Sequence, residues 1–313
     1  MEPTIEVHGL TKRYGHTVAV DDLTFTVPPG AVTGFIGPNG AGKSTTMRLV
    51  MGLDYPQAGT ATVAGRRYRD LAEPLTTIGT LLDASAVHPG RSARNHLRWL
   101  AYSNGIGRAR VDRVLADVGL DRVARRRVGG FSLGMRQRLG IAAALLGDPP
   151  VLMLDEPVNG LDPEGIVWMR KLLRRLASEG RAVLVSSHLM SELQDTADHL
   201  LIIGRGRLIA DTSTAELLAR ASGDRLDVHT DMTTEAMTVL ARAGATVAAG
   251  ETGVVTVTGL AGEEVVSLLA GAGVTYSELR RHRASLEEAY MELTRDVTEF
   301  VAPTPAPTPA EAS

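Results

Sequence analysis

The chain has 313 residues, which predicts two domains, and 44% of its residues are hydrophobic, which is enough for a sizeable core. The absence of cysteine excludes disulfides and thiolate metal sites and suits a reducing cytoplasm. The formal net charge of −3 gives no electrostatic reason to expect nucleic-acid binding. No segment reaches the roughly 18–20 apolar residues of a membrane-spanning helix, and residues 1–6 lack the features of a signal peptide, so we expect a soluble protein.

The N-terminal part of the chain reads as β-structure that leads into a glycine-rich loop. Residues 4–36 form alternating or short apolar runs separated by turns, which predicts an antiparallel β layer. Residues 31–36 are a short apolar strand, residues 37–45 read GPNGAGKST, and a helix begins directly afterwards. The loop fits the pattern G-x-x-x-x-G-K-[ST] of nucleoside triphosphate-binding loops, and strand, loop and helix are the context that the pattern requires.

Each defined residue of that pattern has a chemical reason. Gly37, Gly40 and Gly42 let the backbone curl, so that successive N–H groups point inward at an anion. The positive end of the following helix faces the same anion, Lys43 can reach the β- and γ-phosphates, and the hydroxyl of Ser44 can bind Mg²⁺. We therefore predict a loop for ATP or GTP that consists of Gly37, Pro38, Asn39, Gly40, Ala41, Gly42, Lys43, Ser44 and Thr45.

The middle of the chain reads as a block of helices that precedes two acidic residues. An apolar strand at 78–82 ends at Asp83, and helical patterns follow at 95–101, 108–118 and 134–147. Residues 151–154 are apolar, which is typical of a central strand in a parallel sheet, and Asp155 and Glu156 follow directly. Because such sheets bind ligands at the carboxyl ends of their strands, we expect Asp155 to hold Mg²⁺ through water and Glu156 to act as general base.

Two domains and a tail are predicted. A helix at 164–179, a strand at 182–187 and a hairpin at 200–208 complete a first domain over residues 1–220. The second domain, 221–300, has the β-α-β-β-α-β order of the ferredoxin-like arrangement, followed by an amphipathic helix at 285–293. Its strands are predicted at 225–230, 245–248, 252–259 and 274–281, and its helices at 234–243 and 262–271. Residues 301–313 are rich in Ala, Pro and Thr and are expected to be disordered.

Residues 131–139, which read FSLGMRQRL, resemble the signature of the ATP-binding cassette family, Leu-Ser-Gly-Gly-Gln followed by a basic helix start. The matching residues are Ser132, Gly134, Arg136, Gln137 and Arg138, and the departing residues are Phe131, Leu133 and Met135. In the family this segment caps the γ-phosphate of ATP held by the partner subunit. The resemblance thus implies that Ser132, as a helix N-cap, and Gly134 bind ATP in trans. The Leu and Met variants look like those of the antibiotic and multidrug exporter subfamily.

The resemblance also implies roles for residues elsewhere in the chain. Tyr14 would stack on adenine, unless it is simply a packed surface ring, and residues 159–162 would communicate across a dimer. His188, at the end of the 182–187 strand, would contact the γ-phosphate and hold the attacking water, unless it is structural. Asp83 stands where the family has Gln; it would contact Mg²⁺ and link the nucleotide to a membrane partner, unless it is a solvated residue at a strand end.

The fold class implied is α/β: a P-loop NTPase core with an antiparallel β layer and a helical subdomain, plus a small ferredoxin-like α+β domain. The implied function is the ATP-hydrolysing subunit of an ABC transporter, an exporter of drugs, antibiotics or lipid-like compounds. ATP and Mg²⁺ would be its cofactors, and its partners a separate transmembrane permease and a second copy in a head-to-tail homodimer, with no nucleic acid. It would lie on the cytoplasmic face of the cell membrane, and its second domain would serve regulation, dimer support or passive packing.

Two other classes of function compete with transport: a soluble cassette ATPase that acts on ribosomes or nucleic acid, and a small-molecule kinase. Cassette ATPases that act on ribosomes resemble two fused copies, whereas this chain has one phosphate loop. Cassettes that act on DNA carry a long coiled coil between the loop and the acidic pair, and no sustained heptads occur here between Lys43 and Asp155. A small-molecule kinase would explain the loop but neither the signature nor His188. The chain therefore fits a transporter subunit best.

Overall fold

The computed structural model describes residues 4–250 and 252–294, and the predicted tail at 301–313 lies outside them. The chain divides into two compact units, Met1–Leu217 and Leu218–Ser313. The division falls within helix α8 (Thr214–Ser222), close to the boundary predicted after residue 220. Each unit has its own hydrophobic core and is described separately.

The first unit contains a three-stranded antiparallel sheet in the order β2-β1-β4. Its strands are β1 (Ile5–Tyr14), β2 (Thr17–Val27) and β4 (Ala58–Val63). The prediction of an antiparallel layer over residues 4–36 was wrong for its last strand, β3 (Val32–Ile36), which belongs to the other sheet of this unit. All five residues of β3 are buried, as expected for a central strand that is covered on both faces.

The second sheet of this unit has six strands in the order β5-β6-β7-β3-β8-β9, and all neighbours are parallel except the final pair. Its remaining strands are β5 (Ile78–Leu81), β6 (Val151–Leu154), β7 (Ala182–Ser187), β8 (His199–Gly204) and β9 (Arg207–Ser213). Because β5, β6, β7, β3 and β8 run the same way, the segments that follow them emerge at one edge of the sheet.

The two sheets share one hydrophobic core. Phe25 of β2 and Phe35 of β3 are both buried, and their ring centroids lie 5.5 Å apart at a tilt of 40°, a favourable arrangement for aromatic pairs. Helix α1 (Lys43–Val50) contributes Met47, Leu49 and Val50 to the same core. The phosphate loop therefore connects a buried strand to a helix that is itself packed, which gives it rigid ends.

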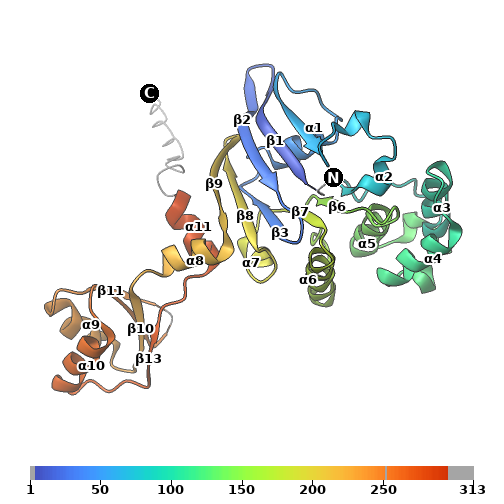
Figure 1. Cartoon of the computed structure of the whole chain (residues 1–313). Coiled ribbons are helices and arrows are strands. Elements are labelled where there is room, and N and C mark those ends of the chain that lie inside the picture. The colour runs from blue at the N-terminus through green and yellow to red at the C-terminus, as the bar shows by residue number, and fades with distance from the viewer. Residues whose placement is uncertain (1–3, 251, 295–313) are drawn as a thin grey trace, which may run out of the picture. The chain divides into compact units, whose positions relative to one another are not determined.

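The helices of the first unit begin at side-chain caps where the sequence provides them. Ser92, Ser132 and Asp162 accept N–H groups at the starts of α3 (Ala93–Ser103), α5 (Leu133–Ala144) and α6 (Pro163–Ser178). Helices α3, α4 (Arg108–Asp117) and α5 pack on one another and form the predicted helical block (Figure 1). The short helices α2 (Pro74–Thr77) and α7 (Met190–Leu193) complete this unit.

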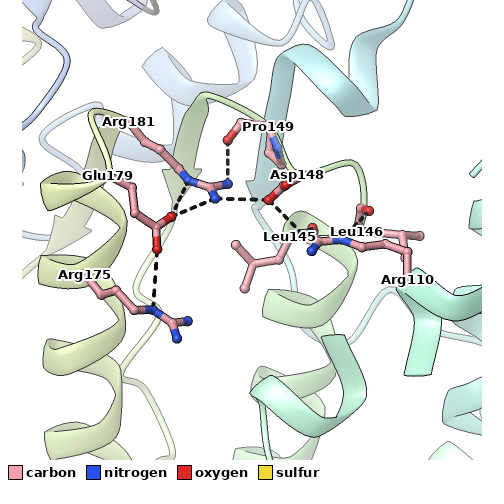
Figure 2. A network of polar contacts seen from close by, with 8 residues as sticks. All are labelled: Arg110, Leu145, Leu146, Asp148, Pro149, Arg175, Glu179 and Arg181. Atoms are coloured by element: carbon pink, nitrogen blue, oxygen red, sulfur yellow. Dashed lines mark hydrogen bonds and ion pairs between the residues drawn. The ribbon is translucent and has the colours of Figure 1, made fainter. Parts of the chain in front are cut away.

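A charged network ties the helical block to the parallel sheet (Figure 2). Arg110 of α4 donates to the carbonyl oxygens of Leu145 and Leu146 at the end of α5 and to Oδ1 of Asp148 at 2.9 Å. Arg181, just before β7, donates to the same Oδ1 at 3.0 Å and to the carboxylate of Glu179. Asp148 thus lies between two guanidinium groups, one from each part of the unit.

Replacing Asp148 with Asn should lower the free energy of unfolding by less than about 1 kcal/mol, because the Asp148 side chain is 59% exposed and water screens its ion pairs. Asn tolerates the positive φ of 55° at this position, so the substitution removes only the charge. Burial opposes ionisation, but Arg181 and Arg110 together lower the pKa of Asp148. The ionised Asp148 therefore stabilises the folded state above the ordinary aspartate pKa of about 3.9. This stabilisation is lost as the pH falls through the lowered pKa of Asp148.

Chemical denaturation of wild type and Asp148→Asn between pH 7 and pH 3 measures this effect. The difference in the free energy of unfolding should be constant above about pH 5 and should shrink below about pH 4. A difference that stayed constant over the whole range would mean that the charge of Asp148 contributes nothing.

The second unit contains a four-stranded antiparallel sheet in the order β11-β12-β10-β13. The elements are β10 (Arg225–His229), α9 (Thr233–Arg242), β11 (Thr246–Ala249), β12 (Val254–Thr258), α10 (Gly262–Gly271), β13 (Glu278–Arg281) and α11 (Leu286–Thr294). Their order and pairing match the predicted ferredoxin-like arrangement. The last strand begins at Glu278 rather than at the predicted residue 274.

Candidate active site

The segments that carry the predicted site residues converge because of the strand order. The phosphate loop follows β3, the acidic pair follows β6 and His188 follows β7, and these three strands are near neighbours in the sheet. A cavity of about 370 Å³ opens at this edge. It is lined by Ala19, Pro38, Asn39, Gly40, Ala41, Gly42, Lys43, Ser44, Thr45, Glu156, Asn159 and His188.

The phosphate loop has the curled backbone that the sequence predicts. Gly40 and Gly42 have φ values of 80° and 107°, in the left-handed region that favours glycine. A side chain at Gly42 would also lie 2.4 Å from the carbonyl oxygen of Ala19. Two backbone hydrogen bonds hold the loop: the N–H of Ala41 donates to the carbonyl oxygen of Pro38, and the N–H of Gly206 donates to the carbonyl oxygen of Ala41.

Lys43 is a buried cation at the start of α1, only 6% exposed. Its Nζ donates to the carbonyl oxygens of Gly37 at 2.6 Å and Pro38 at 3.3 Å, and it lies 4.0 Å from Oε1 of Glu156. Burial lowers the pKa of Lys43, although the charges of Glu156 and Asp155 oppose that shift. An anionic ligand in the cavity would favour the charged form of this side chain.

Glu156 and His188, which both line the cavity, are in direct contact. Nδ1 of His188 lies 2.9 Å from Oε2 of Glu156. An ionised carboxylate only accepts hydrogen bonds, so with an ionised Glu156 the proton of this contact belongs to Nδ1 of His188. The two predicted residues from separate strands thus form one polar pair that faces the phosphate loop.

Two buried polar residues that the sequence analysis did not predict as site residues hold the acidic pair. The hydroxyl of Ser186 donates to Oδ1 of Asp155 and accepts the N–H of Glu156 at 2.9 Å. Nε2 of Gln137 donates to the carbonyl oxygen of Glu156 at 2.9 Å. Neither contact has a local sequence signal, because 30 and 19 residues separate the partners.

Six predicted site residues do not line the cavity: Tyr14, Gly37, Asp83, Ser132, Gly134 and Asp155. Asp83 follows β5, three strands from β3, which corresponds to roughly 14 Å at the usual strand spacing. Its Oδ1 accepts the N–H of Ser85 at 2.7 Å and the hydroxyl of Ser85 at 2.6 Å, and these bonds lower the pKa of Asp83. Tyr14 lies in the antiparallel sheet, 48% exposed, with its hydroxyl donating to Asp54 at 2.9 Å.

The signature segment also lies outside this cavity within a single chain. The side chain of Ser132 accepts the N–H of Met135 at 3.2 Å and so caps α5, as predicted. A side chain at Gly134 would lie 2.9 Å from the carbonyl oxygen of Gly160, so the signature and the 159–162 loop are in close contact. Leu133, which departs from the family signature, packs against Gly160 and stays half exposed.

In the part of the chain that the structure describes, no helix is both long and apolar enough to cross a membrane. Between 4–250 and 252–294, no three His, Cys, Asp or Glu side chains gather as a group that would hold a metal ion.

Comparison with known proteins finds relatives along the chain. The family model "ABC transporter" matches residues 20–159, and a model of a domain of unknown function matches residues 224–287. The bacitracin transport ATP-binding protein BcrA of Bacillus licheniformis is 42% identical over 67% of this chain and 70% of its own length. The daunorubicin resistance ATP-binding protein DrrA3 of Streptomyces coeruleorubidus is 34% identical over 94% of this chain and 97% of its own length.

Solved structures agree with these relatives. The structure of an ATP-binding subunit of an ABC transporter superposes with a TM-score of 0.63 at 29% identity, over 69% of this chain and 92% of that one. The α/β fold with a P-loop core is therefore confirmed. Together with the phosphate loop, the acidic pair and the signature, these similarities show that the chain belongs to the ABC transporter family and is one of its ATP-binding ATPase subunits.

Proposed function

We propose that this chain hydrolyses ATP to drive the export of antibiotics, drugs or lipid-like compounds through a separate membrane permease. The observation that carries the proposal is the convergence of Lys43, Glu156 and His188 around one cavity at the phosphate loop. The direction of transport and the class of cargo rest on the names of relatives, which include bacitracin and lantibiotic transport proteins and a daunorubicin resistance protein. A location on the cytoplasmic face of the membrane follows from this role.

The binding roles follow from the chemistry of the cavity. The N–H groups of residues 37–45 and the ammonium group of Lys43 would hold the phosphates of ATP. The hydroxyl of Ser44 and the carboxylate of Asp155 would hold Mg²⁺, a hard cation that usually takes one or two protein oxygens besides phosphate and water. Bound there, the ion would neutralise charge on the phosphates. Asp83 follows β5, which is three strands from β3 but next to β6, and it would contact such an ion through water.

The hydrolytic roles belong to the pair of Glu156 and His188, which both line the cavity. Glu156 would accept the proton of the attacking water as general base. His188 would hold Glu156 through Nδ1, and its other ring nitrogen, Nε2, would contact the γ-phosphate and the water. Lys43 would stabilise the charge on the phosphates during the transfer.

One chain would supply only half of each ATP site. Ser132 and Gly134 lie outside the cavity of their own chain, so we propose that they cap ATP held by a second copy in a head-to-tail dimer. Trp99 and Tyr102 of α3 are 55% and 90% exposed, and the guanidinium of Arg91 lies 4.9 Å from the ring centroid of Trp99. Exposed aromatic and arginine side chains of this kind suit a protein interface, and we assign this surface to the permease.

The first test is ATP hydrolysis by the purified full-length chain. Lys43→Ala should abolish ATP binding or weaken it by roughly 10²-fold, because it removes the buried cation that would face the phosphates. Isothermal titration with ATP and a phosphate-release assay measure the two effects. Lys171→Ala, which replaces an exposed lysine of α6 that does not line the cavity, is the control and should bind as wild type. ATP binding by Lys43→Ala at wild-type strength would overturn the proposal.

Replacing Asp83 should affect the coupling between the permease and ATP hydrolysis more than it affects hydrolysis itself. We expect Asp83→Ala to reduce the permease-stimulated rate of ATP hydrolysis roughly fivefold, which is near the lower end of the factors by which two coupled sites affect each other. The basal rate of hydrolysis should change little. Asp83→Gln should retain much of both rates. Asp83→Asn is the matched control, because it keeps the oxygen that accepts from Ser85 and removes the charge. Wild-type stimulation of Asp83→Ala by the permease would identify Asp83 as a solvated residue at a strand end.

A further inference from the structure

Ser186 is a fully buried residue whose hydroxyl contacts both members of the acidic pair. It lies near the carboxyl end of β7, next to β6, from which Asp155 and Glu156 follow. A serine hydroxyl has one proton and two lone pairs, and here the proton is donated to Oδ1 of Asp155. The lone pairs are then available for the N–H of Glu156 at 2.9 Å. Asp155 therefore orients the hydroxyl, and the hydroxyl holds the peptide of Glu156.

Gln137 holds the same residue from the other side. It is 4% exposed on α5, and its Nε2 donates to the carbonyl oxygen of Glu156 at 2.9 Å. That oxygen also accepts the N–H of Asn159 at 3.2 Å, so both of its lone pairs are used. The peptide groups on both sides of the Glu156 Cα are thus held by buried side chains from two different elements.

This support is needed because Glu156 has an unusual backbone conformation. Its φ is 47°, in the left-handed region that residues with a side chain rarely adopt. Such a conformation persists only where the surrounding structure holds it. Here it places one carboxylate oxygen 2.9 Å from Nδ1 of His188 and the other 4.0 Å from Nζ of Lys43. A relaxed backbone would turn the carboxylate away from both.

We propose that Ser186 and Gln137 are positioning residues that hold Glu156 in the conformation in which its carboxylate faces the phosphate loop. Gln137 belongs to the helix that begins with the signature segment, so this helix is joined to the hydrolytic glutamate of its own chain. The proposal rests on the role of Glu156 as general base. It adds that the rate of hydrolysis depends on two side chains that do not line the cavity.

The test compares Ser186→Ala and Gln137→Met in the full-length chain and in a Glu156→Gln background, by single-turnover hydrolysis of radiolabelled ATP with Mg²⁺. Each variant should slow hydrolysis about tenfold or more when Glu156 is present, because a misdirected base loses its alignment. The dissociation constant for ATP should stay within about twofold. In the Glu156→Gln background the same substitutions should change the rate by less than about twofold, since a residue that acts through Glu156 has no further effect without it.

Thr33→Val is the matched control, because it removes a buried hydroxyl from β3 of the same sheet that makes no hydrogen bond in the described structure. It should leave the rate unchanged in both backgrounds. Wild-type rates for Ser186→Ala and Gln137→Met, equal losses in both backgrounds, or an ATP affinity that falls as much as the rate would each overturn the proposal. Glu156→Gln with the wild-type rate would instead contradict the role of Glu156 itself.

Discussion

Replacing Glu156 with Gln should lower the steady-state rate of ATP hydrolysis by roughly 10²–10⁴-fold while ATP still binds. Gln has nearly the same shape as Glu, but its amide does not accept a proton from water at neutral pH. Its carbonyl oxygen would still accept from Nδ1 of His188, which lies 2.9 Å from the carboxylate, so the pair should keep its arrangement. Phosphate release and ATP titration on the same preparation measure both quantities.

Glu192→Gln is the matched control for this experiment. Glu192 is a half-buried glutamate that bonds to Ser187 at 2.6 Å and does not line the cavity. Its replacement should lower turnover far less than the replacement of Glu156, since no proposed step uses its carboxylate. Equal turnover of wild type and Glu156→Gln would remove Glu156 from the mechanism.

The same variant tests assembly, because slow hydrolysis should preserve the ATP-bound state. With ATP and Mg²⁺, Glu156→Gln should shift from monomer to dimer in light scattering, and without nucleotide it should not. A protein that stays monomeric with ATP, including in the presence of its permease, would contradict the head-to-tail arrangement.

Gly42→Ala should abolish ATP binding or weaken it by roughly 100-fold or more, which corresponds to about 3 kcal/mol. Gly42 has a φ of 107°, and an added Cβ would lie 2.4 Å from the carbonyl oxygen of Ala19. Because that oxygen belongs to the backbone of β2, the loop itself would have to move. The N–H groups that face the cavity would then lose their common direction. Isothermal titration with ATP measures the loss.

Gly52→Ala is the control that separates the effect of backbone strain from the effect of the clash with Ala19. Gly52 follows α1, also has a positive φ, 63°, and has no atom within 4 Å of an added Cβ. It should lose about 1 kcal/mol of stability from strain and bind ATP as wild type. Circular dichroism of both variants establishes that they are folded. Unchanged ATP affinity in Gly42→Ala would mean that the loop adapts to the added methyl group.

The phosphate loop could be predicted from the sequence because all of its determinants lie close together in the chain. A strand, the motif at residues 37–45 and a helix are contiguous, and each letter is dictated by contact with an anion. The same is true of the buried strand before Asp155 and Glu156, and of Ser132 as the cap of α5. The alternating order of elements beyond residue 221 likewise predicted the ferredoxin-like sheet, because short connections leave few topologies.

Strand order, by contrast, is a property of the tertiary structure alone. The assignment of β3 to the six-stranded sheet, between β7 and β8, follows from pairings made 150 and more residues away in the chain. That order brings Glu156 and His188 to the phosphate loop and leaves Asp83, after the edge strand β5, outside the cavity. A sequence motif identifies the residue at the end of a strand, but it does not show how far that strand lies from the other strands that contribute to the site.

The residues that are chemically able to bind phosphate and accept a proton could be predicted without a structure, because Lys43, Glu156 and their local contexts are encoded within a few positions. The buried groups that hold Glu156 become apparent only in the folded chain. Ser186 and Gln137 reach Glu156 from a neighbouring strand and a helix, and such contacts depend on packing between distant segments rather than on any local pattern. The left-handed backbone of Glu156 is decided in the same way, because only long-range hydrogen bonds offset its local cost.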